Sequence, residues 1–256
     1  MASLDIRVLP VLSDNYVYLA RDPDTGDCAV VDPAVAEPVL QAVKDLGWTL
    51  SQILCTHHHM DHIGGNLEVK QATGCRIVGA RSDGGRIPGI DEMVEEGDSV
   101  AIGNRKARVF ETPGHTSGHI SFWFEDSSAL FCGDTLFSLG CGRLFEGTPE
   151  QMWTSLRKLR GLPDDTLVYC GHEYTNSNAD FALSVDPDNG ALKRRADEVV
   201  TLREAGRPTI PATLGEEKAA NPFLRADDAG LRAAMGLDGQ DPVAAFAEIR
   251  RRKDNF

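Results

Sequence analysis

The chain contains the stretch Thr56-His57-His58-His59-Met60-Asp61-His62, with Gly64-Gly65 close behind it. Four of the seven histidines of the chain fall within this stretch. Imidazole nitrogen and carboxylate oxygen are common ligands of divalent metal ions, whereas a crowd of imidazoles suits neither a core nor an ordinary surface. A solvated polar turn is the alternative, but a cluster of this kind favours metal binding. The stretch therefore predicts a loop that serves two metal ions rather than one, through His57, His59, Asp61 and His62.

Three segments further along the chain supply more potential ligands. They are residues 112–119 with His115 and His119, residues 132–135 with Asp134, and residues 170–174 with His172. Each candidate follows an apolar run that is typical of a strand, and a glycine beside it lets the backbone turn sharply. Strand ends are rigid, so loops anchored there hold side chains with the accuracy that a metal site requires.

The distribution of apolar residues predicts an α/β fold followed by a smaller helical domain. Strands are expected at residues 16–20, 29–31, 52–55, 76–78, 107–110, 120–124, 129–132 and 167–170. Helices are expected at residues 35–46 and from Thr148 to about Arg160, the second opened by the capping box Thr148-Pro149-Glu150-Gln151. After Glu173 the pattern changes to helices joined by connectors rich in proline and glycine. We therefore expect one domain at residues 1–173 and a smaller, helical domain at residues 174–256.

Composition excludes several classes of protein. The net charge of −13 argues against nucleic-acid binding, which depends on neutralising phosphates. Residues 1–7 show no signal peptide, and no apolar segment is long enough to span a membrane. The six cysteines are scattered without a Cys-x-x-Cys pair, which favours a reduced compartment. We therefore expect a cytoplasmic protein that binds neither nucleic acid nor membrane.

The charge is unevenly distributed along the chain. Residues 191–256 hold 12 basic and 11 acidic residues, whereas the preceding 190 residues hold 14 basic and 28 acidic ones. The C-terminal part ends in Arg250-Arg251-Arg252-Lys253. This cluster suits an anionic small ligand, although charge alone fits a solvated helix end equally well.

The order Thr-His-x-His-x-Asp-His, then His, Asp and His, resembles the signature of the metallo-β-lactamase superfamily. That resemblance spans residues 14–172 and implies an αββα sandwich of two sheets with metals at one edge. A closer resemblance, to the glyoxalase II (hydroxyacylglutathione hydrolase) family, covers nearly the whole chain. Its segments are Leu12-Ser13-Asp14-Asn15-Tyr16, Gly140-Cys141-Gly142-Arg143-Leu144-Phe145-Glu146-Gly147-Thr148, Cys170-Gly171-His172-Glu173-Tyr174-Thr175, Asn221-Pro222-Phe223 and Arg250-Arg251-Arg252-Lys253-Asp254.

The resemblance implies two divalent metal ions, with zinc expected and iron or manganese as alternatives. The implied ligands are His57, His59 and His115 for the first ion, Asp61, His62 and His172 for the second, and Asp134 for both. His58 is expected to point away from the ions, and His119 to pack beside the ligands. Asp32 is expected to support a ligand or to be an ordinary turn residue at a strand end.

The implied activity is hydrolysis of S-(2-hydroxyacyl)glutathione, with S-D-lactoylglutathione as the expected substrate and D-lactate and glutathione as products. This is the second step of methylglyoxal detoxification. A hydroxide held between the metals would attack the thioester carbonyl, and Asp61 would orient it as the catalytic residue. The leaving thiolate has a conjugate acid of pKa about 8.5, so it departs without a strong general acid.

The resemblance also implies that residues 1–173 are the catalytic domain and residues 174–256 the substrate-binding domain. It further implies how glutathione is bound. Arg250 and Lys253 would grip the glycine carboxylate, while Arg143 and Tyr174 contact the peptide. Residues three apart share a helix face, so Arg250 and Lys253 are expected to converge on one ligand. Relatives in the family carry Lys and Tyr where this chain has Arg143 and Phe145, so we expect a modest change in affinity and none in the chemical step. We expect the chain to act as a monomer.

Several other functions fit these residues less well. A persulfide dioxygenase is disfavoured by the complete second ligand set and by the basic C-terminus. A β-lactamase or lactonase would not need that terminus, and a flavodiiron reductase would carry glutamate in place of His59. A nuclease is disfavoured by the net charge. A noncatalytic metal-binding module would be expected only if one of the seven ligands were missing, although an intact site does not by itself prove turnover.

Overall fold

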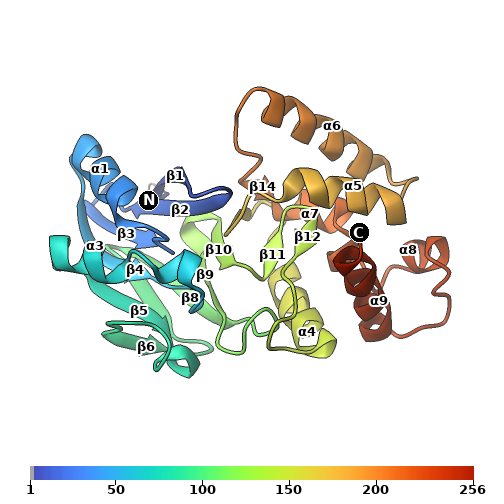
Figure 1. The fold of residues 1–256 in the computed structure, drawn as a ribbon, viewed down its shortest axis with the longest axis horizontal. Helices are drawn as coiled ribbons and strands as arrows, with labels where there is room; N and C mark the ends of the chain where they lie inside the picture. The colour runs from blue at the N-terminus through green and yellow to red at the C-terminus, as the bar shows by residue number, and fades with distance from the viewer. Residues whose placement is uncertain (1–2) are drawn as a thin grey trace. The chain divides into compact units, whose positions relative to one another are not determined.

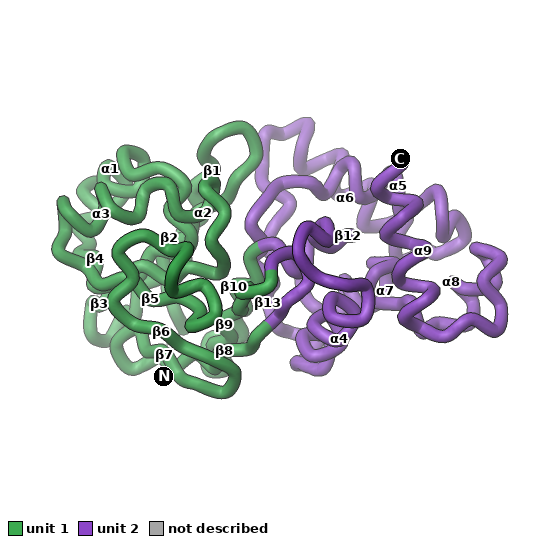
Figure 2. Tube along the Cα trace, turned by 60° about the horizontal axis from the view of Figure 1, so that its bottom comes forward, with its two compact units in different colours: residues 1–111, 117–133 green, residues 112–116, 134–256 purple. Residues whose placement is uncertain are grey.

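The structure of the protein, a computed structural model, describes residues 3–256. Residues 1–2 of the N-terminal stretch considered above lie outside the described residues. Two compact units can be distinguished (Figure 2). Unit 1 runs to Glu111 and also contains Ser117–Gly133, and unit 2 consists of Thr112–Thr116 and Asp134–Phe256.

Unit 1 contains two sheets, and the first has the strand order β1-β2-β3-β4-β5-β6. These strands are β1 (Asp5–Val11), β2 (Asn15–Arg21), β3 (Asp27–Val31), β4 (Thr49–Leu54), β5 (Arg76–Ala80) and β6 (Glu92–Val94). The pairs β1–β2 and β2–β3 are antiparallel, and β3 to β6 run parallel. Helices α1 (Ala36–Leu46) and α3 (Asn66–Thr73) lie on one face of this sheet, where Val39 and Val69 join a buried apolar cluster with Ile53 and Ile77 (Figure 1).

In unit 1 the second sheet has the order β10-β9-β8-β7 and is antiparallel. Its strands are β7 (Ser99–Ile102), β8 (Arg105–Glu111), β9 (Ile120–Phe124) and β10 (Ala129–Gly133). The two sheets of unit 1 meet through aromatic side chains, because the ring of Tyr18 on β2 lies 5.5 Å from that of Phe131 on β10. Both residues are at most 2% exposed, as expected of a sandwich core.

Unit 2 is mostly helical. Its elements are β11 (Leu136–Phe137), β12 (Gly140–Cys141), α4 (Pro149–Arg160), β13 (Leu167–Cys170), α5 (Thr175–Val185), α6 (Gly190–Glu204), β14 (Ala212–Thr213), α7 (Leu214–Ala220), the 3₁₀ turn η3 (Pro222–Leu224), α8 (Ala229–Ala234) and α9 (Pro242–Asp254). Strand β11 pairs with β12, and β13 with β14, both antiparallel. The run of helices expected after Glu173 is confirmed.

The two helices predicted individually are confirmed. Helix α1 ends at Gly47, whose φ of 64° is a left-handed conformation that glycine adopts without strain. The side chain of Thr148 accepts from the backbone N–H of Gln151, and the side chain of Gln151 accepts from the backbone N–H of Thr148. Within residues 3–256, no helix is both long and apolar enough to cross a membrane.

Some elements were not predicted, for reasons that lie in their sequences. Strand β1 is only partly buried and contains Pro10, so it lacks the apolar alternation that marks a strand. Strands β11, β12 and β14 have two residues each, too few for any periodic pattern. Helix α3 has an apolar face reduced to little more than Val69.

Candidate metal centre

In unit 1 the donors lie on residues 56–62, here called the ligand loop, which follows the end of β4 and includes most of the short helix α2 (Met60–Ile63). Nε2 of His57 and Nδ1 of His59 are 3.1 Å apart, and His57 is completely buried. Two ring nitrogens that face each other at this distance share a proton or bind a common cation. The arrangement is what a metal-binding pair of imidazoles requires.

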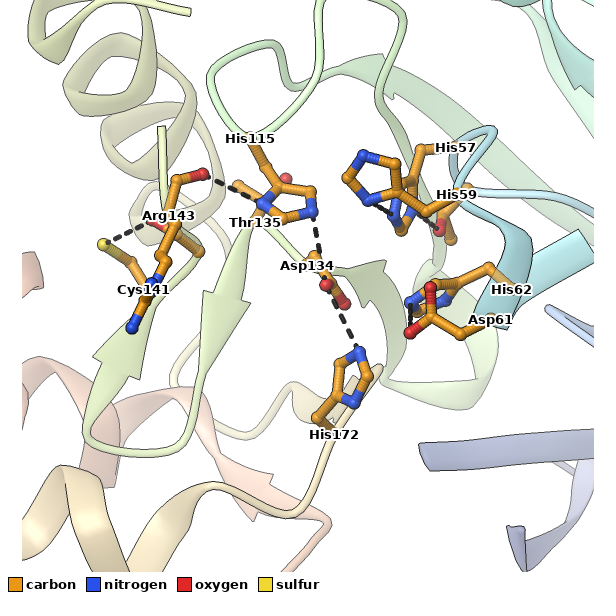
Figure 3. A network of polar contacts seen from close by, with 12 residues as sticks. His57, His59, Asp61, His62, His115, Asp134, Thr135, Cys141, Arg143 and His172 are labelled. Carbon is orange, nitrogen blue, oxygen red and sulfur yellow. Dashed lines mark hydrogen bonds and ion pairs between the residues drawn. The ribbon is translucent and has the colours of Figure 1, made fainter. Parts of the chain in front are cut away.

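Hydrogen bonds to Nδ1 fix the orientation of the imidazole rings of His57 and His62. Nδ1 of His57 lies 3.0 Å from Oγ1 of Thr56, and Nδ1 of His62 lies 3.1 Å from Oδ2 of Asp32. A partner at Nδ1 selects the tautomer in which Nε2 carries the lone pair, as metal-binding histidines require. Nε2 of His62 accordingly faces Oδ2 of Asp61, at 3.6 Å (Figure 3).

Asp32 is an anchor of the ligand loop. It follows β3 with a φ of 50°, and it is 3% exposed. Its Oδ1 accepts from the backbone N–H of Thr56 at 2.7 Å, and its Oδ2 accepts from the Thr56 hydroxyl at 2.6 Å in addition to facing His62. Asp32, His57 and His62 lie close enough together to suggest a metal site of their own. Because the oxygens of Asp32 are occupied by Thr56 and His62, we interpret it as the support of a ligand, one of the two roles expected from the sequence.

The other residues of the ligand loop have partners in unit 1. Asp61 is held by the side-chain amide of Asn15, which donates to its carbonyl oxygen at 3.0 Å and to its Oδ2 at 3.1 Å. Nδ1 of His58 lies 3.2 Å from Oδ2 of the buried Asp83. The ring of His119 stacks on that of His57 with centroids 4.8 Å apart. The packing expected of His119 is therefore observed, and the ring of His58 contacts the carboxylate of Asp83.

In unit 2 three of the predicted ligands meet at one carboxylate oxygen. Oδ2 of Asp134 is 3.4 Å from Nε2 of His115 and 3.4 Å from Nε2 of His172 (Figure 3). Each of the three residues is at most 5% exposed. Nδ1 of His115 lies 2.9 Å from the carbonyl oxygen of Arg143, which directs Nε2 toward Asp134. One oxygen placed equally between two imidazole nitrogens is the geometry of a carboxylate that can bridge two ions.

Glycine is required at two positions close to ligands or their anchors, and one of them, Gly133 beside Asp134, was expected from the sequence. A Cβ at Gly142 would lie 2.0 Å from the carbonyl oxygen of Asp134 and 3.1 Å from Nδ1 of His115, both in unit 2. In unit 1, a Cβ at Gly133 would lie 2.3 Å from Oγ1 of Thr56. Any larger residue would displace a ligand or its anchor. The donor set, made of imidazole nitrogen and carboxylate oxygen without thiolate, fits zinc, iron or manganese.

The four predicted substrate-binding residues all lie in unit 2. The ring of Tyr174 stacks on that of His172, with centroids 4.7 Å apart and planes 3° from parallel. Arg250 is 5% exposed and donates to the carbonyl oxygen of Cys141 at 2.9 Å and to Oδ1 of Asp254 at 2.8 Å. Arg143 is exposed, and its Nε lies 4.0 Å from the same oxygen of Asp254.

Lys253 has an unusual environment for a lysine. Its ammonium donates to the carbonyl oxygen of Ser177 at 2.8 Å and lies 5.4 Å and 5.5 Å from the ring centroids of Phe181 and Phe256. Burial, and next the charge of Arg250, lower the pKa of Lys253 to about 8. Arg143, Arg250 and Lys253 thus form a cationic cluster in which Asp254 contacts the two arginines.

Two buried side chains that were not predicted from the sequence, Glu217 and Asn221, form hydrogen bonds to the hairpin β11–β12, which precedes Arg143. The carboxylate of Glu217 accepts from the Ser138 hydroxyl at 2.7 Å and from the backbone N–H of Leu139 at 2.8 Å. The amide of Asn221 donates to the carbonyl oxygens of Phe137 and Gly140 at 3.1 and 3.0 Å. Burial raises the pKa of Glu217 above its usual range. Asn221 belongs to a segment that resembled the family, but nothing in the sequence indicated its partner.

Comparison with known proteins gives two family matches that together cover most of the chain. Residues 11–172 match the metallo-β-lactamase superfamily, and residues 173–256 match the C-terminus of hydroxyacylglutathione hydrolase. The helical region after Glu173 therefore has a counterpart of its own among known families.

Individual relatives agree with these matches. The chain is 63% identical to a hydroxyacylglutathione hydrolase of Rhodospirillum rubrum and 57% identical to one of Methylococcus capsulatus, over 100% and 99% of both chains respectively. The crystal structure of ETHE1 from Myxococcus xanthus is 28% identical, with a TM-score of 0.68 over 97% of this chain and 98% of that one. The metallo-β-lactamase fold predicted from the sequence is thereby confirmed, together with its C-terminal helical region. The chain belongs to the hydroxyacylglutathione hydrolase (glyoxalase II) family of the metallo-β-lactamase superfamily.

Proposed function

We propose that the chain is a thioester hydrolase that cleaves S-(2-hydroxyacyl)glutathione, with S-D-lactoylglutathione as its substrate, into glutathione and D-lactate. The observation that carries this proposal is the identity of 63% to a hydroxyacylglutathione hydrolase over the full length of both chains. That similarity includes the C-terminal region, which a hydrolase without a glutathione substrate would not need. The persulfide dioxygenase alternative has no comparable support.

We assign the seven donors to two divalent metal ions, with zinc as the first choice and iron or manganese as alternatives. His57, His59 and His115 would hold one ion, Asp61, His62 and His172 the other, and Asp134 both. The fixed tautomers of His57, His62 and His115 support this assignment, because each leaves Nε2 as the metal-binding nitrogen. When bound, such ions supply a water molecule of lowered pKa and polarise the thioester carbonyl.

The residues of the chain then orient the reactants. Asp61 accepts a hydrogen bond from the attacking water and directs it at the carbonyl carbon, which makes it the catalytic residue. Thr56 and Asp32 keep the ligand loop in one conformation, so that little reorganisation accompanies the reaction. The glutathione thiolate leaves with a pKa of about 8.5 for its conjugate acid, so no residue needs to protonate it strongly.

The cationic cluster of unit 2 is assigned to glutathione. Arg250 and Lys253 bind the glycine carboxylate, and Arg143 and Tyr174 contact the peptide. The half-buried position of Lys253 strengthens its attraction for a carboxylate, because water screens the charge less there. Burial and the charge of Arg250 lower the pKa of Lys253, and a carboxylate bound beside the ammonium would raise this pKa again.

We further propose that the protein is a cytoplasmic monomer without nucleic-acid or membrane partners, built from domains at residues 1–173 and 174–256. Analytical ultracentrifugation tests the oligomeric state, and limited proteolysis with mass spectrometry tests the boundary near residue 174. Cleavage confined to some other segment would argue against these domain limits.

Turnover of S-D-lactoylglutathione by the purified protein, with metal content determined on the same sample, is the decisive experiment. Rapid hydrolysis with close to two metal ions per chain is the expected result. Full metal loading without hydrolysis would reject the proposal, and persulfide oxidation would be the next reaction to assay.

A further inference from the structure

Asn15 occupies a position that the seven-ligand assignment leaves unexplained. It is the first residue of β2, directly after the turn that links β1 to β2, and it is 5% exposed. Its side-chain nitrogen donates to the carbonyl oxygen of Asp61 at 3.0 Å and to Oδ2 of Asp61 at 3.1 Å. A side-chain amide nitrogen has two protons, and here both form hydrogen bonds to Asp61.

The double hydrogen bond constrains a side chain that would otherwise be mobile. Asp61 lies in the first turn of α2, and its side chain is 43% exposed. A carboxylate exposed to this degree exchanges between rotamers, and ordering it costs conformational entropy. The Asn15 amide grips the backbone and the carboxylate of Asp61 together, which fixes the side-chain torsion between them.

Asn15 is itself rigidly placed. Strand β2 pairs along its whole length with β1, where Asn15 lies opposite Val11, and residues 18–21 pair with β3. The amide therefore projects from the frame of the first sheet and not from a mobile loop. A buried donor anchored in this way sets the direction of its acceptor.

We propose that Asn15 is a positioning residue for Asp61, which it holds in the orientation that binds metal and directs the attacking water. This inference rests on the proposed function. It makes Asn15 part of the catalytic arrangement although it touches neither metal nor substrate. The competing explanation is that Asn15 only fastens the β1–β2 turn to α2 and contributes to stability alone.

Two substitutions separate these explanations. Asn15→Ala removes both hydrogen bonds, and Asn15→Asp keeps the size but places a second carboxylate against that of Asp61. We expect kcat to fall about 10- to 100-fold in Asn15→Ala, the range seen when partners of metal ligands are removed, and further in Asn15→Asp. KM should change less than about twofold, because the cationic cluster lies on other elements.

Metal release into a chelator provides a readout independent of turnover. We expect at least one metal ion to leave Asn15→Ala faster than wild type, roughly tenfold or more. Asn66→Ala is the matched control. Asn66 is also a buried amide of unit 1, and it donates to Sγ of Cys55 at 3.2 Å instead of to a ligand. It should lose thermal stability while keeping the kcat and metal release rate of wild type.

The outcomes are distinct. Unchanged kcat and metal release in Asn15→Ala, with a lowered melting temperature like that of Asn66→Ala, would overturn the inference. So would an Asn15→Asp variant more active than Asn15→Ala, since size and not donor character would then matter. If wild type does not hydrolyse the thioester, the proposed function fails, while metal release still tests whether Asn15 holds Asp61.

Discussion

At the scale of single residues, the proposed metal centre depends most on Asp134, because its Oδ2 lies 3.4 Å from Nε2 of both His115 and His172. Asp134→Ala removes the bridging carboxylate and its charge. We expect metal content to fall from about two ions per chain to one or fewer, and kcat to fall on the order of 100-fold or more. Elemental analysis and steady-state kinetics on one preparation provide the measurement. A variant that keeps two ions and most of its activity would contradict the bridging role.

Lys253 is expected to act on binding and not on chemistry. Lys253→Met removes the ammonium while retaining an apolar stem against Phe181 and Phe256. Loss of one carboxylate contact should raise KM roughly tenfold, which corresponds to about 1.4 kcal/mol, with kcat nearly unchanged. Arg251→Met, at an exposed position on the same helix, is the matched control and should leave KM unaltered. An unchanged KM in Lys253→Met would exclude the role assigned to this residue.

The pH dependence of Lys253 follows from its lowered pKa of about 8. The ammonium binds a carboxylate and the neutral amine does not, so kcat/KM should be constant below pH 8 and fall as the pH rises through 8. Burial and the charge of Arg250 favour the neutral form, whereas Asp180 opposes them. Lys253→Arg stays charged throughout and should lack this decline. A wild-type profile that stays flat to pH 9.5 would show that the ammonium is not needed.

At the scale of elements, the start of α4 tests how much a local signal contributes. Thr148→Ala removes one half of the capping box and leaves a backbone N–H without its partner. We expect the free energy of unfolding to fall by about 1 kcal/mol, which lowers the melting temperature by roughly 2–4 °C for a chain of this size. Thr201→Ala, within the exposed part of α6, serves as the comparison and should change the melting temperature little. Equal melting temperatures for wild type and Thr148→Ala would show that tertiary contacts alone hold this helix end.

The elements that could be predicted are those whose signals are local. The capping box at Thr148, the helix end at Gly47 and the apolar runs of β9 and β10 each lie within a few residues of sequence. Histidine crowding in the ligand loop was likewise visible, because its donors are neighbours in the chain. Local signals therefore indicate the strands, the helices and the candidate ligands, whereas the family resemblance implies the layered sandwich and the assignment of the ligands to two ions.

What could not be predicted depends on contacts between distant segments. The hydrogen bonds from Asn15 to Asp61 join residues 46 positions apart, and the hydrogen bond from Ser138 to Glu217 joins residues 79 positions apart. A buried carboxylate such as Glu217 looks in the sequence like any other charge on an amphipathic helix. Only the fold shows that its oxygens accept a hydroxyl and a backbone N–H. The segment around Asn15 resembles the family, yet no sequence pattern indicates its partner.

At the scale of the whole molecule, metal binding should contribute to stability, because the proposed ligands are spread from residue 57 to residue 172. The unfolded chain cannot gather them, so binding free energy becomes folding free energy. When the concentration of free metal is about 100 times the dissociation constant, each bound ion raises the free energy of unfolding by about 2.7 kcal/mol. For a chain of this size, removing two ions should lower the melting temperature by roughly 10–20 °C.

Calorimetry with and without a chelator measures this difference. Restoring zinc to the stripped protein should recover the original transition, which distinguishes loss of metal from damage by the chelator. Asp134→Ala supplies the internal control, because a chain that already lacks most of its metal should respond to the chelator by only a fraction of the wild-type shift. If the wild-type transition does not move although elemental analysis shows that both ions have left, then the packing within each unit suffices without metal. The ions would then serve catalysis alone, and the anchoring of the ligand loop by Asp32 and Thr56 would be the reason that it keeps its shape.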